Sequence, residues 1–180
     1  EYFIIGIGMF LIGFLDDLKI NIKPIIRLIL MILILSACIA FFSINIQRID
    51  LIFLNTWMKN EFFLIFFILL CFLFIINGAN LIDGFNGLLA INLLILNLIL
   101  VIINLQNNSS EYLFLLIAQI IILITFILFN FPKAKIFFGD SGSYLFGSLL
   151  VLNVIYTNNF VDDISSFYFC ILLSYIFFEV

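Results

Sequence analysis

Long apolar runs without a charged residue are the feature that most limits how this chain can fold. The run from Phe62 to Ile76 carries no charge at all, and comparable runs recur along the sequence. About 20 consecutive apolar residues are enough for a helix to cross a bilayer. The chain is 66% hydrophobic and only 10% charged, far below the charged fraction of a soluble domain. We therefore predict an integral membrane protein of the all-α class.

The runs predict a polytopic transmembrane helical bundle of about seven spans, the first and last truncated, in a single domain over residues 1–180. The expected spans are Tyr2–Leu15, Ile25–Ile46, Phe62–Ile76, Leu88–Leu105, Tyr112–Phe129, Tyr144–Tyr156 and a segment from Ile164 onward. The chain begins without a methionine and ends inside an apolar run. We therefore expect it to be a fragment of a longer protein.

Counting the spans assigns the polar connections to two opposite faces. The corners at 16–24, 77–87 and 130–143 fall on one face, and the connections at 47–61, 106–111 and 157–163 fall on the other. The first face carries five of the seven basic residues, namely Lys19, Lys23, Arg27, Lys133 and Lys135. Because basic residues are enriched in cytoplasmic loops, we predict that this face is cytoplasmic. The acidic residues of the other face are typical of solvated loops: Asp50, Glu61, Glu111, Asp162 and Asp163.

Several classes of site are excluded by composition. The net charge is −4 and no basic patch is present, so we expect no nucleic-acid partner. The three cysteines each lie in an apolar run and the chain has no histidine, which argues against a zinc site and a disulfide framework.

The central polar motif is Asn77-Gly-Ala-Asn80-Leu-Ile-Asp83-Gly84-Phe-Asn86-Gly87. Polar groups at the end of an apolar run must face protein, water or a ligand. The simplest interpretation is a helix–turn–helix corner, in which Asn and Asp side chains cap a new helix that begins near Gly87.

Two other acidic corners fall on the same face, Asp16-Asp17 and Gly139-Asp140-Ser-Gly-Ser143. Each has an ordinary alternative: a loop in which Lys19 pairs with an aspartate, and a turn followed by a helix cap. The coincidence of all three is harder to explain in this way. Clustered carboxylates need a cation, and oxygen ligands without histidine or cysteine favour Mg²⁺ or Mn²⁺. With the basic residues nearby, the pattern favours metal-dependent phosphoryl transfer.

These motifs resemble, in order and spacing, the signature loops of the polyprenyl-phosphate N-acetylhexosamine-1-phosphate transferases, the MraY/WecA-like enzymes of glycosyltransferase family 4. The segments that carry the resemblance are Gly13-Phe-Leu-Asp16-Asp17, Asn77 to Leu88, Asn130-Phe-Pro132 and Phe137 to Ser143. It implies a Mg²⁺-dependent enzyme of the bacterial inner membrane. Such an enzyme transfers a sugar-1-phosphate from a UDP-sugar to undecaprenyl phosphate and releases UMP, which initiates cell-envelope or lipopolysaccharide glycan synthesis.

The resemblance also implies roles for individual residues. The catalytic positions are Asp16, Asp17 and Asp83. The metal-binding positions are Asp140 and Asn80. The substrate-binding positions are Asn77, Gly84, Asn86, Phe137, Lys23 and Arg27, with Phe137 near the uracil and the two cations near phosphate. The apolar outer faces would suit a homodimer, as in relatives.

One departure from the family concerns histidine. The family carries a histidine-rich motif further toward the C-terminus, and this chain has no histidine. Because Tyr175 to Glu179 resembles the helix before that motif, we expect the motif, like the N-terminal helices, to lie outside these 180 residues. The activity of the chain on its own is therefore in doubt. Asn86, where an acidic residue would be typical of the peptidoglycan enzyme, slightly favours another sugar, and the sequence does not identify the donor.

The rival hypothesis is an ion- or proton-coupled transporter that uses intramembrane carboxylates. It predicts polar residues near the middle of several spans. The candidates are Asn92, Asn97, Gln119 and Asn153, which are uncharged and scattered along the sequence. A purely structural membrane subunit would leave the three acidic corners unexplained.

Overall fold

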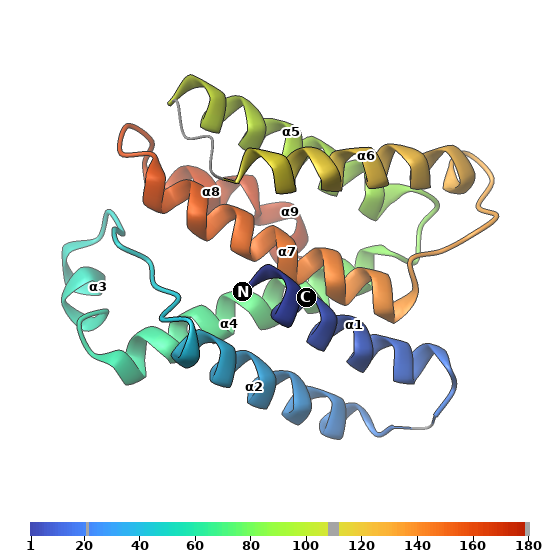
Figure 1. Ribbon diagram of the computed structural model, residues 1–180, viewed down its shortest axis with the longest axis horizontal. Coiled ribbons are helices and arrows are strands. Elements are labelled where there is room, and N and C mark those ends of the chain that lie inside the picture. The colour runs from blue at the N-terminus through green and yellow to red at the C-terminus, as the bar shows by residue number, and fades with distance from the viewer. Residues whose placement is uncertain (21, 108–111, 179–180) are drawn as a thin grey trace.

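The computed structural model describes residues 1–20, 22–107 and 112–178, and all regular structure in these ranges is helical (Figure 1). The helices are α1 (Tyr2–Asp17), α2 (Pro24–Phe41), α3 (Ile52–Trp57), α4 (Glu61–Ile82), α5 (Leu88–Gln106), α6 (Leu113–Asn130), α7 (Gly139–Phe160), α8 (Ser166–Leu172) and α9 (Ser174–Phe178). The predicted all-α membrane bundle is thus confirmed. Glu111 and Glu179, which the sequence analysis discussed, lie outside the described ranges.

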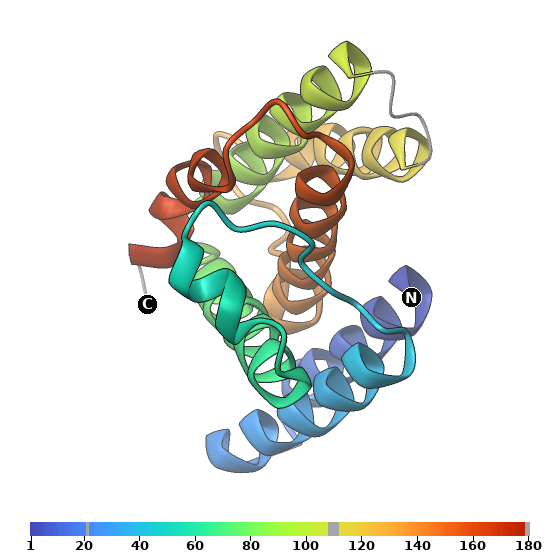
Figure 2. The ribbon, with the colours of Figure 1, turned by 90° about the vertical axis from the view of Figure 1, so that its left-hand side faces the viewer.

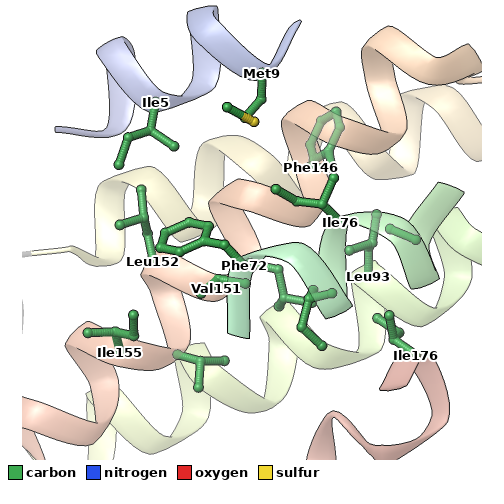
Figure 3. Close-up of a cluster of buried hydrophobic side chains, with 14 of the residues drawn as sticks. Ile5, Met9, Phe72, Ile76, Leu93, Phe146, Val151, Leu152, Ile155 and Ile176 are labelled. Atoms are coloured by element: carbon green, nitrogen blue, oxygen red, sulfur yellow. The ribbon is translucent and has the colours of Figure 1, made fainter. Parts of the chain in front are cut away.

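Helix α7 is the centre of the bundle. It packs against α1, α4 and α5, and the end-on view in Figure 2 shows it surrounded by these helices and their partners. The core between them is made of aliphatic and aromatic side chains, among them Met9 of α1, Phe72 of α4 and Leu152 of α7, all fully buried (Figure 3). Among the described helices, α2, α4, α5 and α6 are long and apolar enough to cross a bilayer by length and composition. Helix α1 has only 16 residues, and α7 is more polar because it is covered by the others.

Six of the seven expected spans correspond to single helices, with shifted ends. The turn in the central motif is shorter than predicted. Helix α4 continues to Ile82, and only residues 83–87 form the turn. Asn77 does not break the helix, since its Nδ2 donates a hydrogen bond to the Leu73 carbonyl oxygen one turn earlier, at 2.7 Å. The seventh span is not continuous: α8 ends at Leu172 and α9 begins at Ser174.

The expected cap of the helix near Gly87 is wrong in its mechanism. Helix α5 does begin at Leu88, but Gly87 is its N-cap and no side chain accepts a hydrogen bond there. Gly87 has a φ of 72°, a left-handed conformation that glycine adopts without steric cost. The turn is therefore made by backbone conformation.

The three acidic corners lie at one end of the bundle, as the counting of spans predicted. In Figure 1 the connections α1–α2, α4–α5 and α6–α7 all lie at the right, whereas α3 and the α7–α8 connection lie at the left. At the left-hand end Arg48 joins two loops, since its Nη1 and Nη2 donate to the carbonyl oxygens of Asp162 and Ile164 at 2.6 and 2.5 Å. Glu61, Asp162 and Asp163 are exposed there, as expected. Asp50 is exposed too, but its carboxylate also accepts a hydrogen bond from the backbone N–H of Ser166, at the start of α8.

The mid-span polar residues are not scattered in the folded protein, which corrects the sequence-based expectation. Asn153 of α7 donates to Asn97 Oδ1 on α5 at 3.0 Å and to Gln119 Oε1 on α6 at 2.9 Å, and it accepts from the Tyr2 hydroxyl at 2.9 Å. Asn92 instead donates to the Leu88 carbonyl oxygen of its own helix. Amides that hydrogen-bond one another join helices in a bilayer, so these contacts have a structural explanation, although Asn97 Nδ2 is buried without a described partner.

Candidate active site

Asp140 is the point at which three elements meet. It lies in the first turn of α7, and its Oδ1 accepts a hydrogen bond from Asn80 Nδ2 near the end of α4, at 2.6 Å. Its Oδ2 accepts from Arg27 Nη1 of α2 at 2.7 Å and from the Tyr144 hydroxyl at 3.2 Å. The structure thus brings the two predicted metal-binding residues, Asp140 and Asn80, into direct contact.

Asp16 joins this centre through Arg27. The same Arg27 nitrogen, Nη1, donates to Asp16 Oδ2 at 2.5 Å. The side chains of Arg27 and Asp16 are 22% and 32% exposed, so the pair is only partly screened by solvent. Arg27 was predicted to meet substrate phosphate, and in this structure it neutralises two carboxylates.

Asp17 has a different environment from its neighbour Asp16. Its two carboxylate oxygens accept the backbone N–H groups of Asp140 and Ser141, each at 3.0 Å. N–H groups in the first turn of a helix have no carbonyl partner within the helix, and the helix dipole favours a negative charge there. The N-terminus of a helix is a natural anion site, and within the protein the anion there is Asp17.

Two glycines allow the corners to approach so closely. A Cβ atom on Gly13 would collide with the backbone carbonyl group of Asp140, so α1 contacts the start of α7 backbone to backbone. Gly139 has a φ of 64°, and a Cβ atom there would lie 2.8 Å from both carboxylate oxygens of Asp17. A larger residue at either position would push the carboxylates of α1 away from Asp140.

Asp83, in the turn after α4, also faces α7. Its Oδ2 accepts the backbone N–H of Gly139 at 3.1 Å. Burial raises the pKa of Asp83 from 3.8 to about 6, and the negative charges of Asp140 and Asp17 add to the rise. Hydrogen bonds from the backbone of Gly139 and Phe138 oppose this rise only in part. All three residues predicted as catalytic therefore lie beside the first turn of α7.

The remaining predicted residues lie further out. Asn77 lines a groove beside Arg27 together with Pro24 and Met31. Asn86 is exposed, and its Nδ2 donates to the carbonyl oxygen of Pro132 at 3.3 Å, which links the α4–α5 turn to the α6–α7 loop. Gly84, Phe137 and Lys23 are exposed on the same end of the bundle. None of these five is bonded to the Asp140 centre by a described contact.

Two contributors were missed in the sequence analysis. Tyr144 is 1% exposed, and besides its bond to Asp140 its ring centroid lies 5.7 Å from Arg27 Cζ. Ser143 is fully buried, and its hydroxyl accepts from Asn80 Nδ2 at 3.1 Å. They follow Asp140 by four and three residues, the spacing that places helical side chains on one face. That spacing was the available signal.

The donor set fits a hard divalent cation. The side chains at the centre carry carboxylate oxygens and, on Asn80, an amide oxygen, and they include no imidazole or thiol, which suits Mg²⁺ or Mn²⁺. Within the described residues no group of three or more acidic, His or Cys side chains is arranged around one point. Mg²⁺ does not require one, because it usually takes one or two protein carboxylates together with substrate phosphates. Four carboxylates lie at this end of the bundle. Arg27 pairs with two of them, and the other two accept backbone N–H groups. This leaves a surplus of negative charge that a cation would offset.

Comparisons with known proteins agree with this picture. The profile of glycosyl transferase family 4 matches residues 2–158. A phospho-N-acetylmuramoyl-pentapeptide-transferase of Streptococcus uberis is 32% identical over 149 residues, which cover 77% of this chain and 44% of the relative. The transferase of the same name from Streptococcus mutans is 31% identical over 77% of this chain and 43% of the relative. That of Streptococcus sanguinis is 35% identical over 49% of this chain and 27% of the relative. The chain thus spans less than half the length of these curated relatives.

Proposed function

The chain belongs to glycosyl transferase family 4, and from that premise we propose that the protein transfers a sugar-1-phosphate from a UDP-sugar to undecaprenyl phosphate, releasing UMP. The observation that carries the proposal is the convergence of α1, α2 and α4 on Asp140 at the start of α7. A lipid phosphate and a soluble nucleotide would meet at this end of the bundle. Similarity to named phospho-sugar transferases supports the same reaction class.

Asp140 and Asn80 are the residues we propose to hold Mg²⁺, or Mn²⁺ in its place. The ion would supply charge neutralisation and Lewis-acid polarisation of the diphosphate. Asn80 is positioned for this task by its bond to Ser143, and Asp140 by its bond to Tyr144. Both side chains are thereby oriented before a ligand arrives, which lowers the cost of reorganisation.

The reaction needs positioning more than a covalent intermediate. An oxygen of the lipid phosphate attacks the β-phosphorus of the UDP-sugar, the bond from that phosphorus to the bridging oxygen breaks, and UMP leaves with the bridging oxygen. We assign to Asp16 the acceptance of any proton still on the lipid phosphate. Asp17 holds the first turn of α7, and Asp83 holds the backbone of Gly139, so both act on the placement of Asp140.

We propose that the predicted residues exposed around the Asp140 centre bind the nucleotide. Gly84 and Asn86 in the α4–α5 turn and Phe137 in the α6–α7 loop are exposed next to the centre. Phe137 offers a ring on which uracil can stack, and Lys23 at the start of α2 offers a charge for phosphate. Asn77 lines the groove beside Arg27, where the substrate diphosphate would lie.

The donor sugar and the cellular setting are also proposals. Because the relatives described above are named phospho-N-acetylmuramoyl-pentapeptide-transferases, a UDP-linked N-acetylmuramoyl-pentapeptide is the first donor to test. The slight preference for another sugar that Asn86 suggested has no support among them. We propose a bacterial inner-membrane location with the Asp140 end in the cytoplasm, and a homodimer through the apolar outer faces. Initiation of lipopolysaccharide synthesis remains the alternative pathway.

The test is an assay of UMP release by the full-length protein in detergent with undecaprenyl phosphate, Mg²⁺ and a panel of UDP-sugars. Release that requires lipid, metal and one sugar would establish reaction and donor together. Asp140→Asn should abolish the metal-dependent release, and full activity in that variant would overturn the metal assignment. The transporter would be favoured by two results together. The folded protein would release no UMP with any sugar of the panel, and it would conduct a small ion in proteoliposomes in a way that Asp83→Asn abolishes.

A further inference from the structure

Arg27 bridges two carboxylates with one nitrogen atom. Nη1 lies 2.5 Å from Asp16 Oδ2 and 2.7 Å from Asp140 Oδ2, which places it between α1 and α7. Structural arginine–carboxylate pairs are frequently bidentate, with two parallel N–H donors on one carboxylate. Here the fork is not used in that way. One guanidinium nitrogen instead neutralises an oxygen of each of two carboxylates, and one of these is Asp140, which we propose to hold the metal.

The charge balance at this end makes that position important. Asp17 and Asp83 accept backbone N–H groups of Asp140 and Gly139 at the start of α7, and Arg27 joins the Asp140 carboxylate to Asp16. Both ion pairs that the described residues form at this end involve Arg27. The guanidinium is therefore the only cation that we see neutralising the cluster directly, in the part of the chain that the structure describes.

We propose that Arg27 occupies the cation position at Asp140 when the metal is not bound, and that a divalent cation must displace the guanidinium from Asp140 before Asp140 and Asn80 can hold it. This inference rests on the proposed function, since it concerns the metal that the site is proposed to hold. Displacement frees the guanidinium for a second task, the binding of substrate phosphate that the sequence predicted. Arg27 is thus a positioning residue that exchanges carboxylates for phosphate once the metal is in place.

The side chain has room to make this exchange. Arg27 lines the same groove as Asn77, on the side of α2 that Leu28 and Met31 also line. Its guanidinium carbon lies 5.7 Å from the centroid of the Tyr144 ring, so a cation–π contact helps to hold it at the carboxylates until a stronger cation competes.

Competition has a measurable consequence for metal affinity. A site whose binding-competent form is populated only in part binds with an affinity reduced by that fraction. Removing the guanidinium should remove this reduction. With a guanidinium-free fraction of about one tenth in the native protein, Arg27→Gln should bind Mn²⁺ about tenfold more tightly than the native protein by this relation. A residue that only anchored the carboxylates in place would show the reverse, because its loss would disorder the ligands.

The first experiment is a titration of the full-length protein in detergent with Mn²⁺, followed by electron paramagnetic resonance of the free ion. Lys19→Gln is the matched control, because it removes one exposed positive charge from the same corner without touching Asp140. Through screened electrostatics alone it should tighten binding by about twofold at most. Tighter Mn²⁺ binding by Arg27→Gln than by Lys19→Gln supports the exchange. An Mn²⁺ affinity of Arg27→Gln that equals the native value or is weaker overturns it.

A second measurement uses the native protein and does not depend on the folding of a variant. Phenylglyoxal modifies accessible guanidinium groups, and mass spectrometry can follow the Arg27 and Arg48 peptides separately. Mn²⁺ should increase the labelling rate of Arg27 several-fold and leave Arg48, at the opposite end of the bundle, unchanged. An unchanged Arg27 rate with Mn²⁺ demonstrably bound overturns the exchange and leaves the proposed function standing. If the native protein binds no Mn²⁺, the metal assignment itself is wrong, and this inference is wrong with it.

Discussion

Asp17 Oδ2 accepts the backbone N–H of Ser141 at 3.0 Å, and this bond fastens the end of α1 to the first turn of α7. Its other oxygen accepts the N–H of Asp140 in the same way. Asp16, one residue earlier, faces Arg27 instead. The two aspartates of the pair therefore have separate tasks: Asp17 stabilises the frame of the site, and Asp16 belongs to its charged centre.

We expect Asp17→Asn to destabilise the protein more than Asp16→Asn. The amide can accept only one of the two backbone N–H groups and loses the negative charge at the helix start, at a cost of about 1–2 kcal/mol. Apparent melting temperatures of the full-length variants in detergent without metal would measure this. Asp163→Asn, an exposed position at the other end, is the control. Equal melting temperatures for Asp17→Asn and Asp163→Asn would contradict the structural task of Asp17.

The close contact of α1 with α7 predicts that Gly13→Ala is harmful. Its new methyl group would meet the backbone of Asp140, and the strain of such overpacking is about 1–3 kcal/mol. Gly84→Ala is the matched change for stability, because the nearest atom to its methyl group would be the Leu81 carbonyl oxygen at 3.7 Å. We expect a lower melting temperature and loss of UMP release for Gly13→Ala, and a native melting temperature for Gly84→Ala. A native-like Gly13→Ala would show that the helices can separate without cost.

The raised pKa of Asp83 predicts a pH dependence of stability. Because the folded protein raises this pKa from 3.8 to about 6, it binds the proton more tightly than the unfolded chain does. The contribution of this group is fully present below pH 3.8 and is lost as the pH rises through about 6. At pH 7.5 the native protein therefore carries the cost of a buried charge that Asp83→Asn does not, about 1–2 kcal/mol after allowance for partial exposure. With EDTA present, the variant should melt a few degrees higher than the native protein at pH 7.5, and the difference should shrink at pH 5. A constant difference at both pH values would refute the assignment.

Much of the fold follows from chain chemistry that is visible in the sequence. Apolar runs of bilayer length specify helices, and the order of spans specifies which connections share an end, so the meeting of Asp17, Asp83 and Asp140 at one end could be predicted. The extension of α4 through Asn77 could not, because it depends on whether the amide bonds to its own helix or to a ligand. Propensity alone does not decide between these bonds.

The contacts that build the centre depend on packing across helices. Arg27 follows Asp16 by 11 residues and lies on another helix, so no local spacing indicates that one nitrogen joins Asp16 to Asp140. Tyr144 and Ser143 were recognisable from helical spacing only after α7 was known to begin at Gly139. The apolar run suggests a helix that begins at Tyr144. In such a helix Tyr144 and Ser143 would not share a helical face with Asp140.

The mid-span amides supply a further prediction, because Asn153 connects α7 to three other helices through hydrogen bonds to Asn97, Gln119 and Tyr2. Replacing it by leucine keeps the approximate volume and leaves two buried amides and the half-buried Tyr2 hydroxyl without this partner. Interhelical hydrogen bonds in membrane proteins contribute about 0.6 kcal/mol on average, so Asn153→Leu should cost about 1–2 kcal/mol in total. Asn92→Leu removes an amide whose described bond lies within its own helix, and it should change stability little. Melting temperatures of the two variants in detergent would test the difference. If ion flux in proteoliposomes fell in Asn153→Leu while its melting temperature stayed native, the cluster would belong to a transport path and not to the scaffold.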